Sequence, residues 1–274
     1  MPTAQRGSNF HELVDIMERL LAPDGCPWDR EQTLQSLEPF LIEEAYEVLE
    51  AIDLDSGLDG AREHCEELGD LLFQIVFQSA LRAREGKFGI DDVVRAIATK
   101  MIRRHPHVFG DAKVKDANEV LANWGKLKEI EHKEKGIARR ALEGVPVNLP
   151  ALLRAQRLGE KAAAVGFDWP DVAGVREKVD EELREIDEAV KGGDPAQIEH
   201  ELGDLLLAVS RLSAKLGVAP EDALRSALRR FQGRFEAMED RVIARGVKVG
   251  DTPLEELDRI WNEVKKVEPA LPKK

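Results

Sequence analysis

The sequence predicts an all-α fold made of a duplicated helical unit, and three observations carry that prediction. Apolar residues recur three and four positions apart along almost the whole chain, which is the period of an amphipathic helix. Charged residues make up 34% of the chain and aromatic residues only 5%, a balance that favours helices over strands. The string ELGDLL occurs at 67–72 and again at 201–206, as expected of an internal repeat.

The first half of the chain predicts a series of helices separated by turn residues. Ser8 or Asn9 is a suitable N-cap for the first helix, whose apolar stripe begins at Phe10. The turn-rich stretch APDGCPWD (22–29) then interrupts the helical pattern. The later helices are expected at about 34–54, between the DSGLDG turn (55–60) and the EGKFG turn (85–89), at about 91–104, and at about 116–135.

The second half repeats this pattern after a stretch rich in glycine and proline. We expect an N-terminal helical domain at 1–135, a linker at 136–149 and a C-terminal helical domain at 150–274. The landmarks match by offset, because Glu182 lies 138 residues after Glu44, and Glu201 lies 134 residues after Glu67. The helices of the second half are expected at about 150–164, 172–191, 197–216, 220–246 and 253–267.

Composition excludes several classes of protein. The formal net charge of −13 disfavours a nucleic-acid or anionic-membrane surface, since phosphates would be repelled. Two cysteines, Cys26 and Cys65, are too few for a disulfide framework and indicate a reducing compartment. Neither a secretory signal nor a membrane span is recognisable, so we expect a cytoplasmic protein.

Acidic residues lie in pairs beside the apolar stripes of four helices. On a helical wheel, Glu182 flanks a stripe of Val179, Leu183, Ile186 and Val190, and Glu185 lies on the same side as Glu182. The other three pairs are Glu201 with Asp204, Glu44 with Glu47, and Glu67 with Asp70. If two such helices pack on their stripes, four carboxylates converge at the edge of the core in each half.

Converging carboxylates repel one another unless a cation compensates their charge. An all-oxygen site suits Mg²⁺ or Mn²⁺ rather than zinc. One isolated acidic pair is most simply a solvated helix face, but chance explains four matching pairs poorly. A ferritin-like di-iron site would need Glu-x-x-His, whereas Ala61 and Gln197 stand three residues before His64 and His200.

Basic and aromatic residues also recur at matching places. Lys100 and Arg104 are four residues apart, as are Arg230 and Arg234, and Trp124-x₃-Lys128 is repeated as Trp261-x₃-Lys265. Such groups suit the outer phosphates and the base or sugar of a polyanionic substrate. The alternative is ordinary surface charge and buried tryptophans. His105-Pro106-His107 is better explained as a capped turn than as a metal site.

The motifs resemble the MazG nucleoside triphosphate pyrophosphohydrolases in their two-domain form. The strings that carry the resemblance are DGCPWDREQT, EEAYEVLEA, ELGDLLFQ, RRHPHVFGD, LPALLRAQ, VGFDW, EELREIDE and ELGDLLLA. It implies the all-α NTP pyrophosphatase fold, a helical bundle usually completed in a homodimer. It also implies Mg²⁺-dependent hydrolysis of (d)NTPs to (d)NMPs and pyrophosphate, in nucleotide-pool housecleaning or a stress response. The alternative is a non-catalytic helical interaction protein that retains the fold.

The resemblance also implies roles for individual residues. Metal binding and catalysis fall on Glu182, Glu185, Glu201 and Asp204, with Glu44, Glu47, Glu67 and Asp70 as the metal motif of the first half. The nucleotide- and phosphate-binding positions are Lys178, Glu181, Arg230, Arg234, Trp261 and Lys265, with Lys100, Arg104, Trp124 and Lys128 in the first half. Arg230 stands where a lysine is common. The second half is expected to be the catalytic one, with Glu43 or Glu181 as a further choice for general base.

Overall fold

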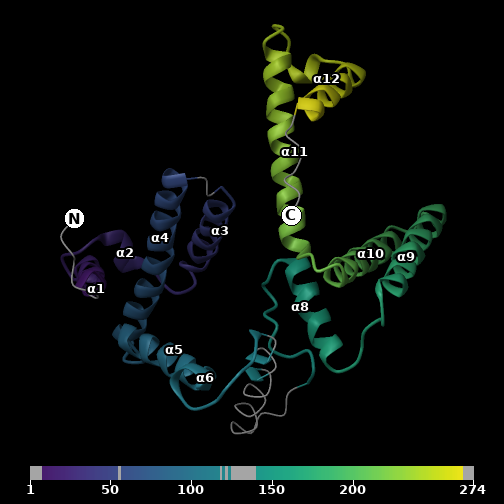
Figure 1. Cartoon of the computed structure of the whole chain (residues 1–274). Coiled ribbons are helices and arrows are strands. Elements are labelled where there is room, and N and C mark those ends of the chain that lie inside the picture. The colour runs from purple at the N-terminus through teal and green to yellow at the C-terminus, as the bar shows by residue number, and fades with distance from the viewer. Residues whose placement is uncertain (1–7, 55–56, 118, 121–122, 125–139, 268–274) are drawn as a thin grey trace. The chain divides into compact units, whose positions relative to one another are not determined.

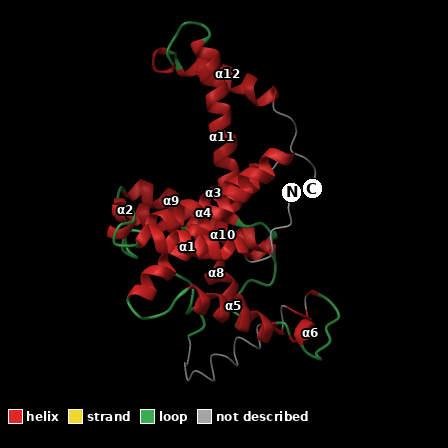
Figure 2. Ribbon diagram, turned by 90° about the vertical axis from the view of Figure 1, so that its left-hand side faces the viewer, coloured by secondary structure: helices red, strands yellow, loops and turns green. Residues whose placement is uncertain are grey.

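The computed structural model describes residues 8–54, 57–117, 119–120, 123–124 and 140–267. Within these ranges every regular element is a helix and no strand occurs (Figure 2), which confirms the all-α prediction. Contacts between residues divide the chain into two compact units, Met1–Lys135 and Gly136–Lys274. In the described ranges, no helix carries an apolar stretch sufficient to cross a lipid bilayer.

The first unit is organised around two long helices that pack side by side, α3 and α4 (Figure 1). Its core consists of Met17, Leu21, Leu37, Val76 and Phe77, which are almost completely buried. The described helices are α1 (Ser8–Leu21), α2 (Pro27–Glu31), α3 (Glu38–Leu54), α4 (Gly57–Arg84), α5 (Ile90–Arg104) and α6 (Pro106–Phe109).

The second unit contains a similar helical pair, α9 and α10, which packs on α8. The long helix α11 leads away from that pair and carries α12 along its side (Figure 1). Met238, Val242, Ile260 and Val264 form the buried seam between α11 and α12. The described helices are α8 (Ala151–Ala164), α9 (Val172–Gly192), α10 (Pro195–Lys215), α11 (Pro220–Ile243) and α12 (Leu254–Val267), with a 3₁₀ turn at Val249–Asp251.

The helix boundaries depart from the sequence predictions in three places. The expected turn at 22–29 contains the start of the short helix α2, because Pro27 suits the first helical position. The helix predicted from about 34 begins at Glu38, since the hydroxyls of Thr33 and Ser36 accept hydrogen bonds from each other's backbone amides and hold a turn. His105 ends α5 but also precedes the one-turn helix α6. Most of the helix predicted at 116–135 lies outside the described residues.

The prediction that one apolar stripe of α9 is buried was wrong in part. Val179 is buried, but Leu183 is 47% exposed and Val190 is 58% exposed. The buried residues of the α9–α10 pair include the acids Glu182 and Glu201, together with small residues such as Ala189 and Ala208. The acids therefore lie inside the helix–helix contact rather than at its edge, while several leucines face outward.

Candidate metal centres

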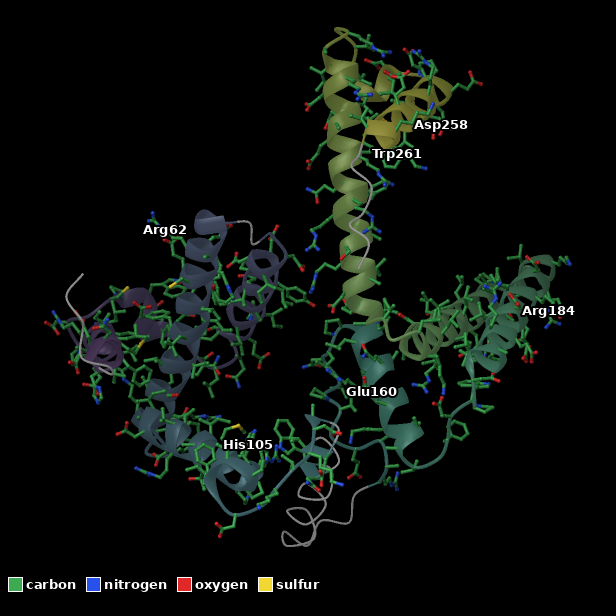
Figure 3. All side chains as sticks on the ribbon, viewed as in Figure 1. Arg62, His105, Glu160, Arg184, Asp258 and Trp261 are labelled. Atoms are coloured by element: carbon green, nitrogen blue, oxygen red, sulfur yellow. The ribbon has the colours of Figure 1, made fainter. Side chains whose placement is uncertain are left out.

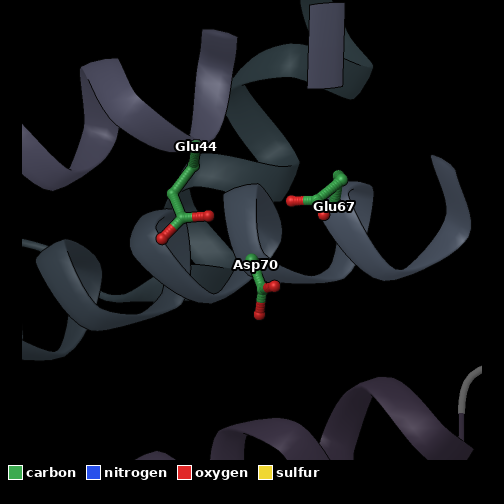
Figure 4. Close-up of side chains that lie close together, drawn as sticks. All are labelled: Glu44, Glu67 and Asp70. Carbon is green, nitrogen blue, oxygen red and sulfur yellow. The ribbon is translucent and has the colours of Figure 1, made fainter. Parts of the chain in front are cut away.

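Each unit brings three carboxylates together on its long helical pair. In the first unit, Glu44 of α3 faces Glu67 and Asp70 of α4 (Figure 4). In the second unit the equivalent three are Glu182, Glu201 and Asp204. In both groups, one carboxylate oxygen from each residue lies within 4.8 Å of the others, a spacing that a hard divalent cation can bridge.

Local helix geometry explains why the same three positions meet twice. Residues three apart on a helix share a face, so Glu67 and Asp70 point the same way, as do Glu201 and Asp204. A short connection between α9 and α10, capped by left-handed Gly193 and by Asp194, brings the second helix back along the first. The third carboxylate is thereby set opposite the pair.

Electrostatic repulsion in the first cluster is visible in its pKa values. Burial raises the pKa of Glu44, and the charges of Asp70 and Glu47 raise it further, while a hydrogen bond with Gln74 works in the opposite direction. Burial likewise raises the pKa of Glu67, and Glu47 and Asp70 add to that effect. A bound divalent cation would offset both the burial and the repulsion that raise the pKa values of Glu44 and Glu67.

The second cluster is more deeply buried and has polar neighbours of its own. Glu182 is 3% exposed and Glu201 is 7% exposed. The Nζ of Lys178 lies 2.8 Å from Glu182 and 3.0 Å from Glu181, and the Glu182 carboxylate raises the pKa of Lys178. The Nε2 of His200 lies 3.4 Å from Asp204, and Gln197 donates a hydrogen bond to Glu201.

One atom of this cluster points directly to a missing ligand. The Oε2 of Glu182 is buried, and among the described residues it has no hydrogen-bond partner. Burying a carboxylate oxygen without a partner costs on the order of 1–3 kcal/mol or more, so the site is unfavourable as it stands. The residues therefore fit a divalent metal ion, with that oxygen as one ligand.

The fourth predicted acid of each half lies beside the group of three and not within it. Burial raises the pKa of Glu185, a hydrogen bond with Glu182 raises it further, and Lys178 opposes the shift. Glu47 adds repulsion to both Glu44 and Glu67. Glu47 and Glu185 are therefore neighbours of the clusters, and their role as direct ligands stays a prediction.

The predicted basic and aromatic residues of the second half lie on a different pair of helices. Arg230 and Arg234 belong to α11, and Trp261 and Lys265 belong to α12. Trp261 packs beside α11 (Figure 3), with its ring centroid 5.4 Å from that of Phe231. Neither the second cluster nor the cavity that borders it includes any of these four residues. The described part of one chain does not bring the two sets together.

The corresponding residues of the first half also stay on their own helices. Trp124 donates a hydrogen bond of 2.9 Å from Nε1 to the carbonyl oxygen of Arg104, and its ring meets His105 edge-on at 5.1 Å. Lys100 borders a shallow hollow on α5 with Arg95 and Arg103. Lys128 lies outside the described residues. Trp124 thus caps the end of α5, and its role in nucleotide binding stays a prediction.

A cavity of about 490 Å³ borders the second cluster and was missed at the level of sequence. Its walls include Trp169 and Arg211 as well as Glu182 and Asp204. Leu142, in the predicted linker, also lines it. Two signals in the sequence pointed there. Arg211 interrupts the apolar run LLLAVSRLSA, and Gly159 lies inside a helix where glycine costs about 1 kcal/mol.

Comparison with known proteins agrees with this geometry. The MazG nucleotide pyrophosphohydrolase domain matches residues 32–109 and 173–238, and these two segments contain the two carboxylate clusters. The fold and the paired acidic sites thus define a class of helical nucleotide pyrophosphohydrolases.

Individual relatives make the assignment specific. A nucleoside triphosphate pyrophosphohydrolase/pyrophosphatase MazG of Thermotoga maritima is 45% identical over 262 residues, which cover 95% of this chain and 97% of that protein. A nucleoside triphosphate pyrophosphohydrolase of Escherichia coli K12 is 43% identical over 266 residues, covering 95% and 98%. The uncharacterized protein YabN of Bacillus subtilis is 43% identical over 263 residues, covering 94% and 52%. The chain belongs to the MazG nucleotide pyrophosphohydrolase family.

Proposed function

We propose that the protein hydrolyses nucleoside triphosphates between the α and β phosphates, and that the second carboxylate cluster does this with Mg²⁺. The single observation that carries the proposal is the second cluster itself, in which the buried Oε2 of Glu182 lacks a partner beside Glu201 and Asp204. The similarity to named pyrophosphohydrolases along nearly the whole chain supports the reaction. A role in nucleotide-pool housecleaning fits that reaction.

The protein's own groups divide the work around the triphosphate. Glu182, Glu201 and Asp204 would hold the metal, and the metal would supply positive charge for the phosphates. Lys178 lies one helical turn before Glu182, and its ammonium group would be available to a phosphate oxygen of the substrate. Glu181, which is exposed and also contacts Lys178, is the proposed acceptor of the proton from the attacking water, with Glu43 at the same position of the first half.

We also propose that the functional protein is a homodimer. Large apolar side chains are exposed along the α9–α10 pair, and a Cβ added to Gly203 would meet no atom within 4 Å. Exposed apolar faces of this kind mark contacts between proteins, and a second copy would also bring another α11–α12 pair to the site. The exposed residues are Leu183, Val190, Leu202, Leu206, Leu207 and Val209.

The dimer is tested by light scattering on the purified chain. The wild type is expected to have twice the mass of one chain. Leu206→Glu is expected to lower the measured mass towards that of one chain without changing the helical content. Leu254→Glu, at an 80% exposed position on α12, is the matched control and should leave the mass unchanged. A monomeric wild type would refute the dimer.

The activity is tested by pyrophosphate release from dNTPs with and without Mg²⁺. Glu182→Ala, Glu44→Ala and the double variant are compared with the wild type. We expect release to be lost in Glu182→Ala and kept in Glu44→Ala. Undiminished release by the double variant would remove the metal hypothesis, and absence of release from the wild type would favour a non-catalytic role.

A further inference from the structure

The cavity beside the second cluster lies between α8, α9 and α10, and its walls are of two kinds. Glu182 and Asp204 form one side together with Lys178. The remaining wall is largely apolar and aromatic, with Leu158, Ala162, Phe167, Trp169, Leu207 and Ala208. A volume of about 490 Å³ falls in the range of small-molecule sites, which are mostly apolar with a few polar groups placed at one side.

The aromatic and basic walls of this cavity are held in place by specific contacts. Asp168 contacts Arg211 at 2.6 Å and Lys215 at 2.7 Å, which ties the loop bearing Trp169 to α10. Lys215 also donates a hydrogen bond of 2.6 Å to the carbonyl oxygen of Trp169. Because Arg211 is only 8% exposed, this ion pair is shielded from solvent and fixes the position of the wall.

Two helical glycines leave the room that these side chains need. A Cβ at Gly159 would lie 1.9 Å from the guanidinium of Arg211, and a Cβ at Gly174 would lie 2.8 Å from the ring of Trp169. Glycine inside a helix is unfavourable by about 1 kcal/mol relative to alanine. The close approaches give both glycines a structural reason, and they show that the cavity wall is a built feature.

The first unit differs from the second at the positions that correspond to this wall. Counting 134 residues back from Ala208 and Arg211 gives Gln74 and Phe77, both of which are buried. Phe77 belongs to the hydrophobic core of that unit, and Gln74 interacts with Glu44. The first unit therefore has the longer side chain of Gln74 where the second has only the methyl group of Ala208 next to its carboxylates.

We propose that this cavity binds the nucleoside part of the triphosphate, with the base against Trp169, and that Ala208 is the residue that makes the room. The inference rests on the proposed function, since it places the phosphates at the adjoining cluster. The hollow on the other side of the cluster is bordered by Glu185, Glu188, Asp194 and Glu201. It is acidic and lacks an aromatic wall, so it suits cations rather than a nucleoside.

The test measures binding of two probes to the full chain in the presence of Mg²⁺. One probe is α,β-methylene-dTTP, which carries a nucleoside but has no scissile α–β bond, and the other is inorganic tripolyphosphate. Ala208→Gln introduces the side chain found at position 74 of the first unit. We expect this variant to bind the analogue about tenfold or more weakly, and to change the affinity for tripolyphosphate by less than about twofold.

Matched variants separate the cavity from general effects of the substitutions. Ala223→Gln, on an exposed position of α11, and Gln74→Ala should leave both affinities unchanged. Phe167→Ala does not threaten folding, because Phe167 is 79% exposed, and it should weaken the analogue alone by about threefold. If Ala208→Gln does not fold, Phe167→Ala decides the question.

The inference is overturned if Ala208→Gln and Phe167→Ala leave the affinity for the analogue unchanged. It is equally overturned if they lower the affinities for both probes by the same factor. It is also overturned if Trp261→Ala selectively weakens the analogue while the cavity variants do not, since the base would then lie on α12. Failure of the proposed function is a separate result, because it appears as a wild type that releases no pyrophosphate from dNTPs.

Discussion

One helical turn before Glu182 the chain carries Lys178, whereas one turn before Glu44 it carries Phe40. The ammonium group of Lys178 lies 2.8 Å from Glu182, while the ring of Phe40 packs against Trp28 at 5.8 Å. The two units therefore share the three converging carboxylates and differ in the residues around them. Among the described residues, the second cluster has a lysine at the position of Phe40, and it borders the cavity described above.

This difference teaches that a duplicated site can keep the spacing of its carboxylates while the residues around it change. Carboxylate spacing is set by helix period, so it survives changes in the neighbouring side chains. Substrate binding depends on the volume and charge next to the cluster. A single difference between the units can change these, as where the first unit has Gln74 and the second has Ala208. The acid motif alone thus does not report which unit acts on the substrate.

The largest effect is expected from removing one ligand in each unit. Glu201→Gln should lower pyrophosphate release by at least about a hundredfold, because even groups that only orient a metal ligand contribute ten- to a hundredfold. Glu67→Gln, the matched change in the first unit, should alter the rate by less than about twofold. Steady-state kinetics with a saturating dNTP measures both. An equal loss in the two variants would show that the units act together.

The next effect concerns the wall of the cavity. Asp168→Asn should lower the free energy of unfolding of the second unit by about 2 kcal/mol, because it leaves Arg211 and Lys215 without their carboxylate. This figure lies below the cost for a fully buried pair because the side chains are partly exposed. Asp180→Asn, in the same unit, breaks an ion pair whose partners Arg176 and Asp180 are 61% and 49% exposed, and it should cost less than about 0.5 kcal/mol.

Urea denaturation followed by the fluorescence of Trp169 and Trp261 measures these costs, with Trp28 and Trp124 replaced by phenylalanine in every variant. Similar costs for Asp168→Asn and Asp180→Asn would contradict the assigned role of Asp168.

A smaller effect is expected from the lysine that distinguishes the two units. Lys178→Met should raise KM for a dNTP about tenfold, the loss expected for one partly exposed charge-assisted contact to phosphate. Lys191→Met, at the exposed end of the same helix, is the control and should leave KM unchanged. A fall in kcat without any change in KM would mean that Lys178 serves the metal ligands and not the substrate.

The smallest expected effect is the pH dependence of the difference in unfolding free energy between the wild type and Asp168→Asn. A hydrogen bond from Lys215 holds the pKa of Asp168 below its ordinary value of 3.8, and Arg211 lowers it further. Because the pKa is lower in the folded state, the stabilisation is complete above the ordinary value and is lost as pH falls through the lowered one. The unfolding free energies of the wild type and Asp168→Asn should therefore begin to converge only as pH falls below 3.8. A difference that stays constant far below pH 3.8 would refute the ion pair.

The helical period predicted the fold class and the positions of the long helices. It also predicted that acids would converge in each half, and three of the four predicted acids do so. The outward orientation of Leu183 and Val190 did not follow from the period, because a wheel shows that residues share a face but not which neighbour covers it. The cavity was beyond such reasoning for another reason. Its wall depends on the ion pair between Arg211 and Asp168, the neighbour of Trp169, and these two residues lie 43 positions apart in the sequence.

A side chain at position 159 is incompatible with Arg211 in its present place. With a Cβ at position 159 only 1.9 Å from the guanidinium, even alanine would force the arginine out of its place beside Asp168. Over evolutionary time the two positions should therefore be substituted as a couple: lineages with a side chain at the first should show a shorter residue at the second. Such linked replacement would trace, across many genomes, where the wall of the cavity has been rebuilt.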